Sequence, residues 1–192
     1  GIKNGMPICL GYLAVSFTLG ITARNAGMTA WQAMLTSLAC NASAGQYAGF
    51  TVIAAGGTYF EMVLMELVAN ARYLLMSCSL SQKFSSETGL LHRLLVGFDV
   101  TDEIFGVAVS EPGKLNPFYN YGMMTVAIPG WSLGTFFGVI MGNILPANIV
   151  SALSVGLYGM FLAIIIPPAR KNKVIAALVT ISMVSSYIFS RL

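Results

Sequence analysis

Long apolar stretches, interrupted by short polar clusters, dominate this chain. No formal charge occurs between Arg24 and Glu61, and none occurs from Leu115 to Ala169. As one helix the first stretch would extend about 54 Å, whereas the hydrocarbon core of a bilayer is about 30 Å thick. Its centre carries the polar cluster Asn41–Gln46, so we predict that the helix breaks there. Broken backbone is tolerated in a membrane only where protein or a polar cavity satisfies its N–H and C=O groups.

The apolar pattern predicts a series of membrane helices and half-helices. They are expected at about Gly5–Ala23, Thr29–Cys40, Tyr47–Tyr59, Phe60–Gln82, Phe118–Gly142, Ala147–Ile166 and Val174–Ser190. The basic connections Lys83–Arg93 and Arg170–Lys173 both belong in the cytoplasm by the positive-inside rule. The intervening pieces would place these connections on opposite faces, so one piece must fail to cross. The short acidic segment Leu94–Ser110 is therefore predicted to be re-entrant or half-spanning.

A weak internal similarity indicates two repeat halves. Leu19-Gly20-Ile21 is followed by Asn25, and Phe137-Gly138-Val139 is followed by Asn143 at the same offset. Paired repeats are common in transporters, which bind substrate near the middle of the membrane at the repeat interface. We therefore expect one transmembrane transporter domain over residues 1–192. Its inverted-repeat halves would be about 1–110 and 115–192, the second of them truncated.

The composition is that of an all-α, polytopic integral membrane protein with about six or seven membrane helices or half-helices. The chain is 56% hydrophobic and 9% charged, whereas soluble domains carry about 25% charged residues. A membrane barrel would show short alternating segments instead of continuous apolar runs. The Lys and Arg residues lie mostly at the ends of the predicted spans, so the net charge of +3 does not indicate nucleic acid binding.

Motifs for catalysis or cofactor binding do not occur in the sequence. Cys9, Cys40 and Cys78 lie in apolar runs without metal-site spacing, and His92 is the only histidine. HExxH, GxSxG, Walker A and GxGxxG motifs are all missing. We therefore expect neither an enzyme nor a bound metal or other cofactor.

The predicted break at Asn41–Gln46 is the first candidate site. The N-terminus of a half-helix favours an anionic group such as a carboxylate. Gln46 can both donate and accept hydrogen bonds, and Gly45 allows a ligand to approach closely. The alternative is that Gly45 and Gly49 form a packing face of small residues.

Polar residues on the predicted helix Phe60–Gln82 form the second candidate site. Glu66 and Asn70 lie four residues apart and share a helical face. A charge at the bilayer centre costs about 2.5–3.5 kcal/mol, so a helix that carries several must face protein or water. Glu66 and Arg72 are therefore candidates for proton coupling. The alternative for Arg72 is a structural ion pair with a carboxylate on another helix.

The triplet Thr101-Asp102-Glu103 is the third candidate site. Adjacent carboxyl groups at the start of an embedded helix can bind a proton, a cation or an amino group, because burial and mutual repulsion favour their protonated forms. The alternative is an exposed first turn in which Thr101 caps the helix. Separately, the doubled GxxxG pattern of Gly134, Gly138 and Gly142 predicts close packing against another helix of this chain or a second subunit.

A set of motifs runs through nearly the whole chain. In order they are Gly5-Met6-Pro7-Ile8, Gly11-Tyr12, Ala44-Gly45-Gln46-Tyr47, Asn70-Ala71-Arg72-Tyr73-Leu74-Leu75-Met76-Ser77, Ser79-Leu80-Ser81-Gln82, Gly97-Phe98, Thr101-Asp102-Glu103, Gly130-Trp131, Gly134-Thr135 and Leu145-Pro146. Together they resemble the AzlC family, the larger subunit of two-component branched-chain amino acid exporters. Tyr47 is a departure, because phenylalanine is commoner there.

The resemblance implies a multi-pass protein of the bacterial cytoplasmic (inner) membrane that works with a small hydrophobic AzlD-type subunit. The implied substrates are valine, leucine and isoleucine, with methionine as a further candidate. We expect alternating access, with the substrate carboxylate at the broken helix, its ammonium at Asp102 or Glu103, and a proton on Glu66, Asp102 or Glu103. Substrate contacts are expected at Asn41, Ser43, Gly45, Gln46, Tyr47, Asn70, Thr101 and Asp102.

Two other functions fit the same sequence. One is a passive channel for a small polar solute, and the other is a membrane scaffold whose GxxxG face only recruits a partner. Saturable transport with trans-stimulation distinguishes a carrier from a channel, and counterflow of a labelled substrate distinguishes a carrier from a scaffold.

Overall fold

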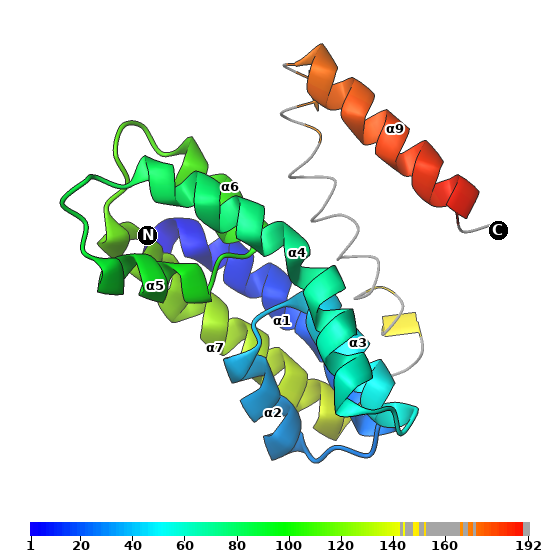
Figure 1. The fold of residues 1–192 in the computed structure, drawn as a ribbon. Coiled ribbons are helices and arrows are strands. Elements are labelled where there is room, and N and C mark those ends of the chain that lie inside the picture. Colours follow the sequence, from blue (N-terminus) through cyan, green and yellow to red (C-terminus); the bar gives the residue numbers. More distant parts are fainter. Residues whose placement is uncertain are drawn as a thin grey trace. The chain divides into compact units, whose positions relative to one another are not determined.

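The computed structural model describes residues 1–142 and 172–189, with positions 144, 148–149, 152, 166 and 169–170 between them. These residues belong to two units, Gly1–Gly156 and Leu157–Leu192, which we describe separately. The first unit contains α1 (Ile2–Asn25), α2 (Ala30–Ala39), α3 (Ser43–Ala54), α4 (Tyr59–Lys83), α5 (Leu90–Phe98), α6 (Asp102–Ser110) and α7 (Pro117–Met141) (Figure 1). The second contains α9 (Lys173–Phe189), close to the predicted Val174–Ser190.

The all-α membrane class is confirmed for the described part of the chain, where the only β pairing is an isolated bridge between Phe84 and Leu115. Among the described residues, α1, α4 and α7 are long and apolar enough to cross a membrane. The helices α2, α3, α5 and α6 have 10, 12, 9 and 9 residues. Each therefore reaches roughly half the thickness of the hydrocarbon core. The predicted span at 147–166 lies largely outside the described residues.

Side-chain caps fix where several helices begin. Thr29 and Gln32 form a capping box at α2, and Thr58 and Glu61 form another at α4. Such boxes satisfy the free N–H groups of a first helical turn. Asn116 caps α7, whose first residue is a proline that needs no N–H partner there.

The break in the first charge-free stretch occurs earlier than predicted. It covers residues 40–42, and α3 begins at Ser43 instead of Tyr47, so most of the polar cluster belongs to the first turn of a helix. The predicted end at Tyr59 is also wrong. The helix ends at Ala54 because Gly56 adopts a φ of 66°, a left-handed conformation that terminates helices.

The segment Leu94–Ser110, predicted as one re-entrant piece, contains the end of α5 and all of α6, separated by residues 99–101. The predicted polar connection Lys83–Arg93 is correspondingly shorter, because α5 already begins at Leu90. Arg93 misled the prediction. Its guanidinium turns back from α5 and donates hydrogen bonds to the carbonyl of Ser81 in α4 and to those of Ser85 and Thr88 in the connection, so this charge does not mark a loop.

The helices α1 and α7 lie side by side and form the centre of the first unit (Figure 1). Glycines allow this close approach. A Cβ atom on Gly5 would lie 2.9 Å from the Cα of Met123, and one on Gly20 would lie 2.7 Å from the Cα of Gly138. Gly20 and Gly138 are the matched glycines of the weak internal similarity, so that similarity coincides with a direct contact.

The doubled GxxxG pattern of α7 lies along the same contact. A Cβ atom on Gly134 would meet backbone of Leu13, and one on Gly138 would meet the carbonyl oxygen of Phe17. Gly142 lies beside the side chain of Ile21. Within this chain, α1 is therefore the helix that packs against the pattern.

The order of one long helix followed by two short ones occurs twice, first in α1, α2 and α3 and then in α4, α5 and α6. This relationship differs from the predicted halves 1–110 and 115–192. The second of those halves lies partly outside the described residues, so that division stays a prediction.

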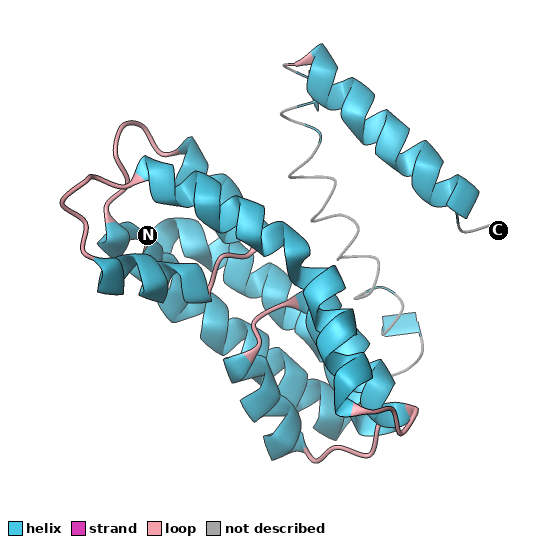
Figure 2. Cartoon of the chain, viewed as in Figure 1, coloured by secondary structure: helices cyan, strands magenta, loops and turns pink. Residues whose placement is uncertain are grey.

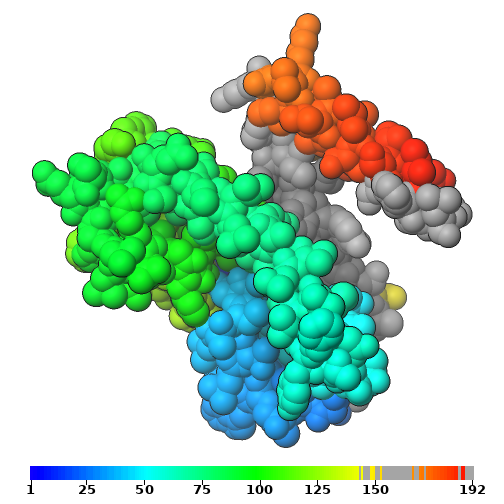
Figure 3. All heavy atoms as spheres, viewed as in Figure 1, coloured from blue at the N-terminus to red at the C-terminus, as the bar shows by residue number. Residues whose placement is uncertain are grey.

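The helix α4 runs across one face of the first unit (Figure 3). In its most apolar stretch, 6% of the residues are buried, whereas the corresponding shares are 44% for α1 and 50% for α7. Val68 and Leu75, for example, are 79% and 76% exposed. The outer face of α4 therefore presents apolar surface of the kind that contacts lipid or another apolar helix.

Replacing Gly138 by alanine should destabilise the first unit by about 1–3 kcal/mol, because the added methyl group would force backbone of α1 and α7 apart. The matched control is Gly106→Ala on α6, where a Cβ atom meets nothing within 4 Å. Denaturant titration in mixed detergent micelles measures both free energies of unfolding. Equal values for the two variants would contradict the close packing of α1 and α7.

Candidate functional site

The two interrupted helices meet within the first unit. The C-cap residue of α2 is Cys40, with φ −125° and ψ 43°, and that of α5 is Asp99, with φ −121° and ψ 42°. The two breaks therefore start with nearly the same backbone geometry. Asn41 Nδ2 donates a hydrogen bond to Asp99 Oδ1 and joins the breaks directly. Figure 2 shows the two connections approaching each other. Each break therefore supplies the other with a polar partner.

A cavity of about 150 Å³ lies at this meeting point. A dry cavity of about that volume can hold a molecule the size of benzene. The lining is mostly apolar and comes from both breaks and from α4, through Ala39, Cys40, Asn41, Ala42, Asn70, Tyr73, Gly97, Phe98 and Val100. Its size and lining suit an aliphatic side chain accompanied by a small polar group.

Three buried side-chain oxygens in this region have no hydrogen-bond partner among the described residues. Asn41 Oδ1 and Asn70 Oδ1 belong to residues that line the cavity, and Asp99 Oδ2 belongs to a residue that does not line it but is bonded to Asn41. Asp99 is only 1% exposed and Asn41 is 9% exposed. Leaving a buried acceptor unsatisfied costs about 1–3 kcal/mol. Three such acceptors close together therefore suit a ligand that donates several hydrogen bonds.

Asp99 lies in the connection between α5 and α6 and is almost fully buried. Burial disfavours the charged form of a carboxyl, whereas the hydrogen bond that Asn41 donates favours it. The Asp99 carboxyl is therefore a candidate for binding a proton.

The start of α6 is tied to α1. Thr101 caps α6 by accepting a hydrogen bond from the N–H of Ile104 at 3.3 Å, as the capping alternative for this triplet proposed. The Tyr12 hydroxyl lies 2.5 Å from Thr101 Oγ1 and donates to Glu103 Oε2 at 2.6 Å. Glu103 therefore already has a partner from another helix.

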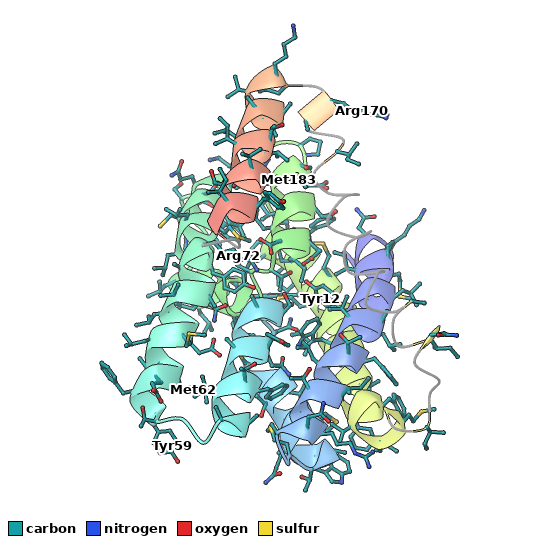
Figure 4. The ribbon with its side chains drawn as sticks, turned by 90° about the vertical axis from the view of Figure 1, so that its right-hand side faces the viewer. Tyr12, Tyr59, Met62, Arg72, Arg170 and Met183 are labelled. Atoms are coloured by element: carbon teal, nitrogen blue, oxygen red, sulfur yellow. The ribbon has the colours of Figure 1, made fainter. Side chains whose placement is uncertain are left out.

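Arg72 pairs with Asp102 across α4 and α6, with Nη1 and Oδ2 3.0 Å apart. This is the interhelical ion pair that we considered as the structural alternative for Arg72. Tyr12 and Arg72 both point into the middle of the bundle, whereas Tyr59 and Met62 lie near the N-terminal end of α4 (Figure 4). Among the described residues, no three His, Cys, Asp or Glu side chains are placed to hold a metal ion.

Gln46 belongs to a buried network that connects α2, α3 and α7. Its Nε2 donates to Ser37 Oγ, and its Oε1 accepts a hydrogen bond of 2.9 Å from Trp131 Nε1. Ser37 Oγ in turn donates to Thr135 Oγ1 at 2.7 Å. Gln46 is 1% exposed, and both ends of its amide are bonded to protein. The network therefore holds three helices together.

Glu66 and Asn70 face α3. Asn70 Nδ2 donates to Glu66 Oε2 at 2.7 Å. A Cβ atom on Gly45 would lie 2.6 Å from Asn70 Nδ2, and one on Gly49 would lie 3.1 Å from Glu66 Oε1. Gly45 and Gly49 thus form the face of small residues that the packing alternative proposed, and side chains of α4 pack against it.

Of the predicted substrate contacts, Asn41 and Asn70 line the cavity. Tyr47 is 57% exposed and Ser43 is half-buried at the start of α3. Neither of these two residues lines the cavity, and the same holds for the remaining predicted contacts, Gly45, Gln46, Thr101 and Asp102.

Asp99 is the residue that sequence reasoning passed over. The predicted site began at Thr101 because that triplet carries two adjacent carboxylates. A signal was available, since a polar residue follows each short helix: Asp99 comes one residue after the end of α5, and Asn41 comes two residues after the end of α2. Trp131 and Tyr12 were noted only within motifs, and their hydrogen-bonding partners lie on distant helices.

The Arg72–Asp102 pair predicts a measurable energetic coupling. Arg72→Met and Asp102→Asn should together destabilise the protein by about 0.5–1 kcal/mol less than the sum of the single changes, because both side chains are partly exposed. Unfolding in mixed micelles measures the double-mutant cycle. Lys3→Met combined with Asp102→Asn is the control, since Lys3 is exposed, and a similar coupling in that cycle would refute the specific pair.

Comparison with known proteins agrees with this architecture. An Archaeoglobus fulgidus protein called an uncharacterized membrane protein is 30% identical over 179 residues, which cover 92% of this chain and 78% of that protein. The Escherichia coli inner membrane protein YgaZ is 26% identical over 147 residues, covering 74% of this chain and 60% of YgaZ. No solved structure matches the chain. The sequence model of the AzlC protein family matches residues 7–145, and the chain therefore belongs to the AzlC family of transporter-type membrane proteins.

Proposed function

We propose that this chain is the large subunit of a two-component exporter of small aliphatic amino acids. The proposed substrates are valine, leucine and isoleucine, with methionine as a further candidate. The main support for this proposal is the small, mostly apolar cavity where two interrupted helices meet. Transporters commonly bind substrate at discontinuous helices near the middle of the membrane. Membership in the AzlC family supports the same conclusion.

The cavity offers a separate environment for each part of an aliphatic amino acid. Phe98 and Val100 provide apolar surface for the side chain. The carboxylate belongs at the N-terminus of α3, where Ala42 lines the cavity and provides no side-chain cap. By contrast, Thr101 occupies the corresponding position of α6 with a capping hydroxyl. Free N–H groups and the positive end of the helix dipole favour an anion at α3.

The rest of the assembly is proposed on the resemblance. The second component would be a small hydrophobic AzlD-type subunit, and the location would be the bacterial cytoplasmic membrane. A relative from Escherichia coli is an inner membrane protein, which supports that location. The exposed apolar face of α4 has the character needed for contact with lipid or a second membrane subunit.

A carrier is favoured over the two other functions by the site itself. A cavity of about 150 Å³ between two helix breaks suits one small molecule at a time. A scaffold would need neither this cavity nor its unpartnered oxygens. Counterflow of labelled valine in proteoliposomes containing both subunits would support a carrier, and linear, non-saturable flux would support a channel.

Filling the cavity should block transport. Ala42→Leu adds three carbons to a buried lining residue, so valine counterflow should fall at least about tenfold if the cavity holds the aliphatic side chain. The matched control is Ala44→Leu, two residues further along and exposed. Unaltered counterflow in a folded Ala42→Leu variant would exclude the cavity as the substrate site.

Proton coupling gives a second expectation. Valine efflux from proteoliposomes should accelerate when the pH gradient drives protons in the direction opposite to valine, because a buried carboxyl group can carry a proton across the membrane. Glu66→Gln, Asp102→Asn and Glu103→Gln test the carboxylates expected from the sequence. Efflux that is indifferent to the gradient in the wild-type protein would rule out coupling.

A further inference from the structure

Asp99 differs from the other carboxylates of the first unit in having a fully buried oxygen without a partner among the described residues. Asp102 pairs with Arg72, Glu103 accepts from Tyr12, and Glu66 accepts from Asn70. Asp99 Oδ1 accepts from Asn41, but its Oδ2 has no partner among the described residues. Asp99 is also the most buried of these carboxylates. A buried carboxylate left with a free oxygen is costly unless a ligand completes it.

The surroundings of Asp99 attract a cation. Within the described part of the chain, the titratable group that acts electrostatically on Asp99 is Glu103, which is also acidic. The C-terminal ends of α2 and α5 also meet here, at Cys40 and Asp99. A helix C-terminus carries partial negative charge and unsatisfied carbonyl oxygens. Half-helix C-terminal ends with such carbonyls bind cations in membrane transporters.

The free acceptors match one chemical group. Asn41 Oδ1, Asn70 Oδ1 and Asp99 Oδ2 are all without partners in the described residues. A primary ammonium group carries three N–H donors and one positive charge. The helix termini also match the two charges of an amino acid. The N-terminus of α3 is partly positive and suits the carboxylate, whereas the C-termini of α2 and α5 are partly negative and suit the ammonium.

We propose that Asp99 and Asn41 bind the ammonium group of the transported amino acid, and that a proton competes with this group for the Asp99 carboxyl. The inference rests on the proposed export function and names the cation-binding group of its site. It replaces Asp102 or Glu103 as the expected partner of the ammonium.

Competition at one carboxyl would couple the two fluxes. When the ammonium arrives, the proton on Asp99 leaves to water, and when the ammonium departs, a proton returns. The other titratable groups around this region are Cys40 and Tyr73, which line the cavity, and Glu66, which is bonded to Asn70. Glu103 on α6 and Tyr12 on α1 are bonded to each other, and Arg72 pairs with Asp102. Exchange transport requires that the Asp99 carboxyl bind either a proton or an ammonium group, but not both at once.

The test measures binding to the purified full-length chain by titration calorimetry. The probes are valine, isobutylamine, which lacks the carboxylate, and 3-methylbutanoate, which lacks the ammonium. Asp99→Asn should weaken valine and isobutylamine about 10- to 100-fold and leave 3-methylbutanoate unchanged. The matched control Glu87→Gln, which removes an exposed carboxylate, should bind all three probes like the wild type.

Binding measurements at different pH values and with Na⁺ distinguish an ammonium group, a proton and a free cation as ligands of Asp99. Isobutylamine affinity should fall as the pH is lowered in the wild type, because protons compete for the carboxyl, and it should lose this dependence in Asp99→Asn. If Asp99→Asn abolishes Na⁺ binding but leaves isobutylamine binding intact, the ammonium assignment is overturned in favour of a free cation.

The outcomes keep this inference distinct from the proposed function. Equal valine and isobutylamine binding by wild type and Asp99→Asn would overturn the Asp99 site and leave the export function standing. A wild-type protein that binds neither valine nor isobutylamine would overturn both. If Asp99→Asn does not elute as a folded protein, Asn41→Ser takes its place, with an expected loss of about tenfold for isobutylamine and none for 3-methylbutanoate.

Discussion

A helix can be interrupted inside a membrane only where protein supplies partners for the exposed polar groups, because hydrocarbon supplies none. The first unit depends on this constraint, since both α2–α3 and α5–α6 are interrupted. The two breaks meet, and Asn41 bonds to Asp99 across them. α4 contributes Asn70 and Tyr73 to the same place. Polar atoms therefore gather on one small cavity that is otherwise lined by apolar groups.

The surrounding helices differ in how firmly they are held. α1 and α7 approach at backbone distance through glycines, and Gln46, Trp131 and Ser37 tie α2 and α3 to α7 by buried hydrogen bonds. The helix α6 contacts its neighbours through fewer residues and through partly exposed groups such as Arg72 and Asp102. Within the first unit, α1 and α7 are therefore the most closely packed pair.

The charges around the cavity are arranged by the same breaks. A break places a helix C-terminus and a helix N-terminus next to each other, and these carry partial charges of opposite sign. An amino acid in its zwitterionic form carries a similar separation of charge. The short helices therefore offer complementary ends without requiring a charged side chain for each group. Asp99 adds a carboxyl group where two helix C-termini already favour a cation.

Apolar periodicity and charge placement were enough to predict the all-α membrane class and the positions of α1, α4 and α7 to within about a turn, because spans must match the bilayer and end at polar residues. The break near Asn41 was predictable for the same reason. The sequence did not reveal that Gln46 bonds to Trp131, 85 residues away, or that Asn41 bonds to Asp99, 58 residues away. Such pairings arise only when distant helices pack. The tertiary structure therefore decided which polar atoms are used by the fold, as in Gln46, and which remain free for a ligand, as in Asp99.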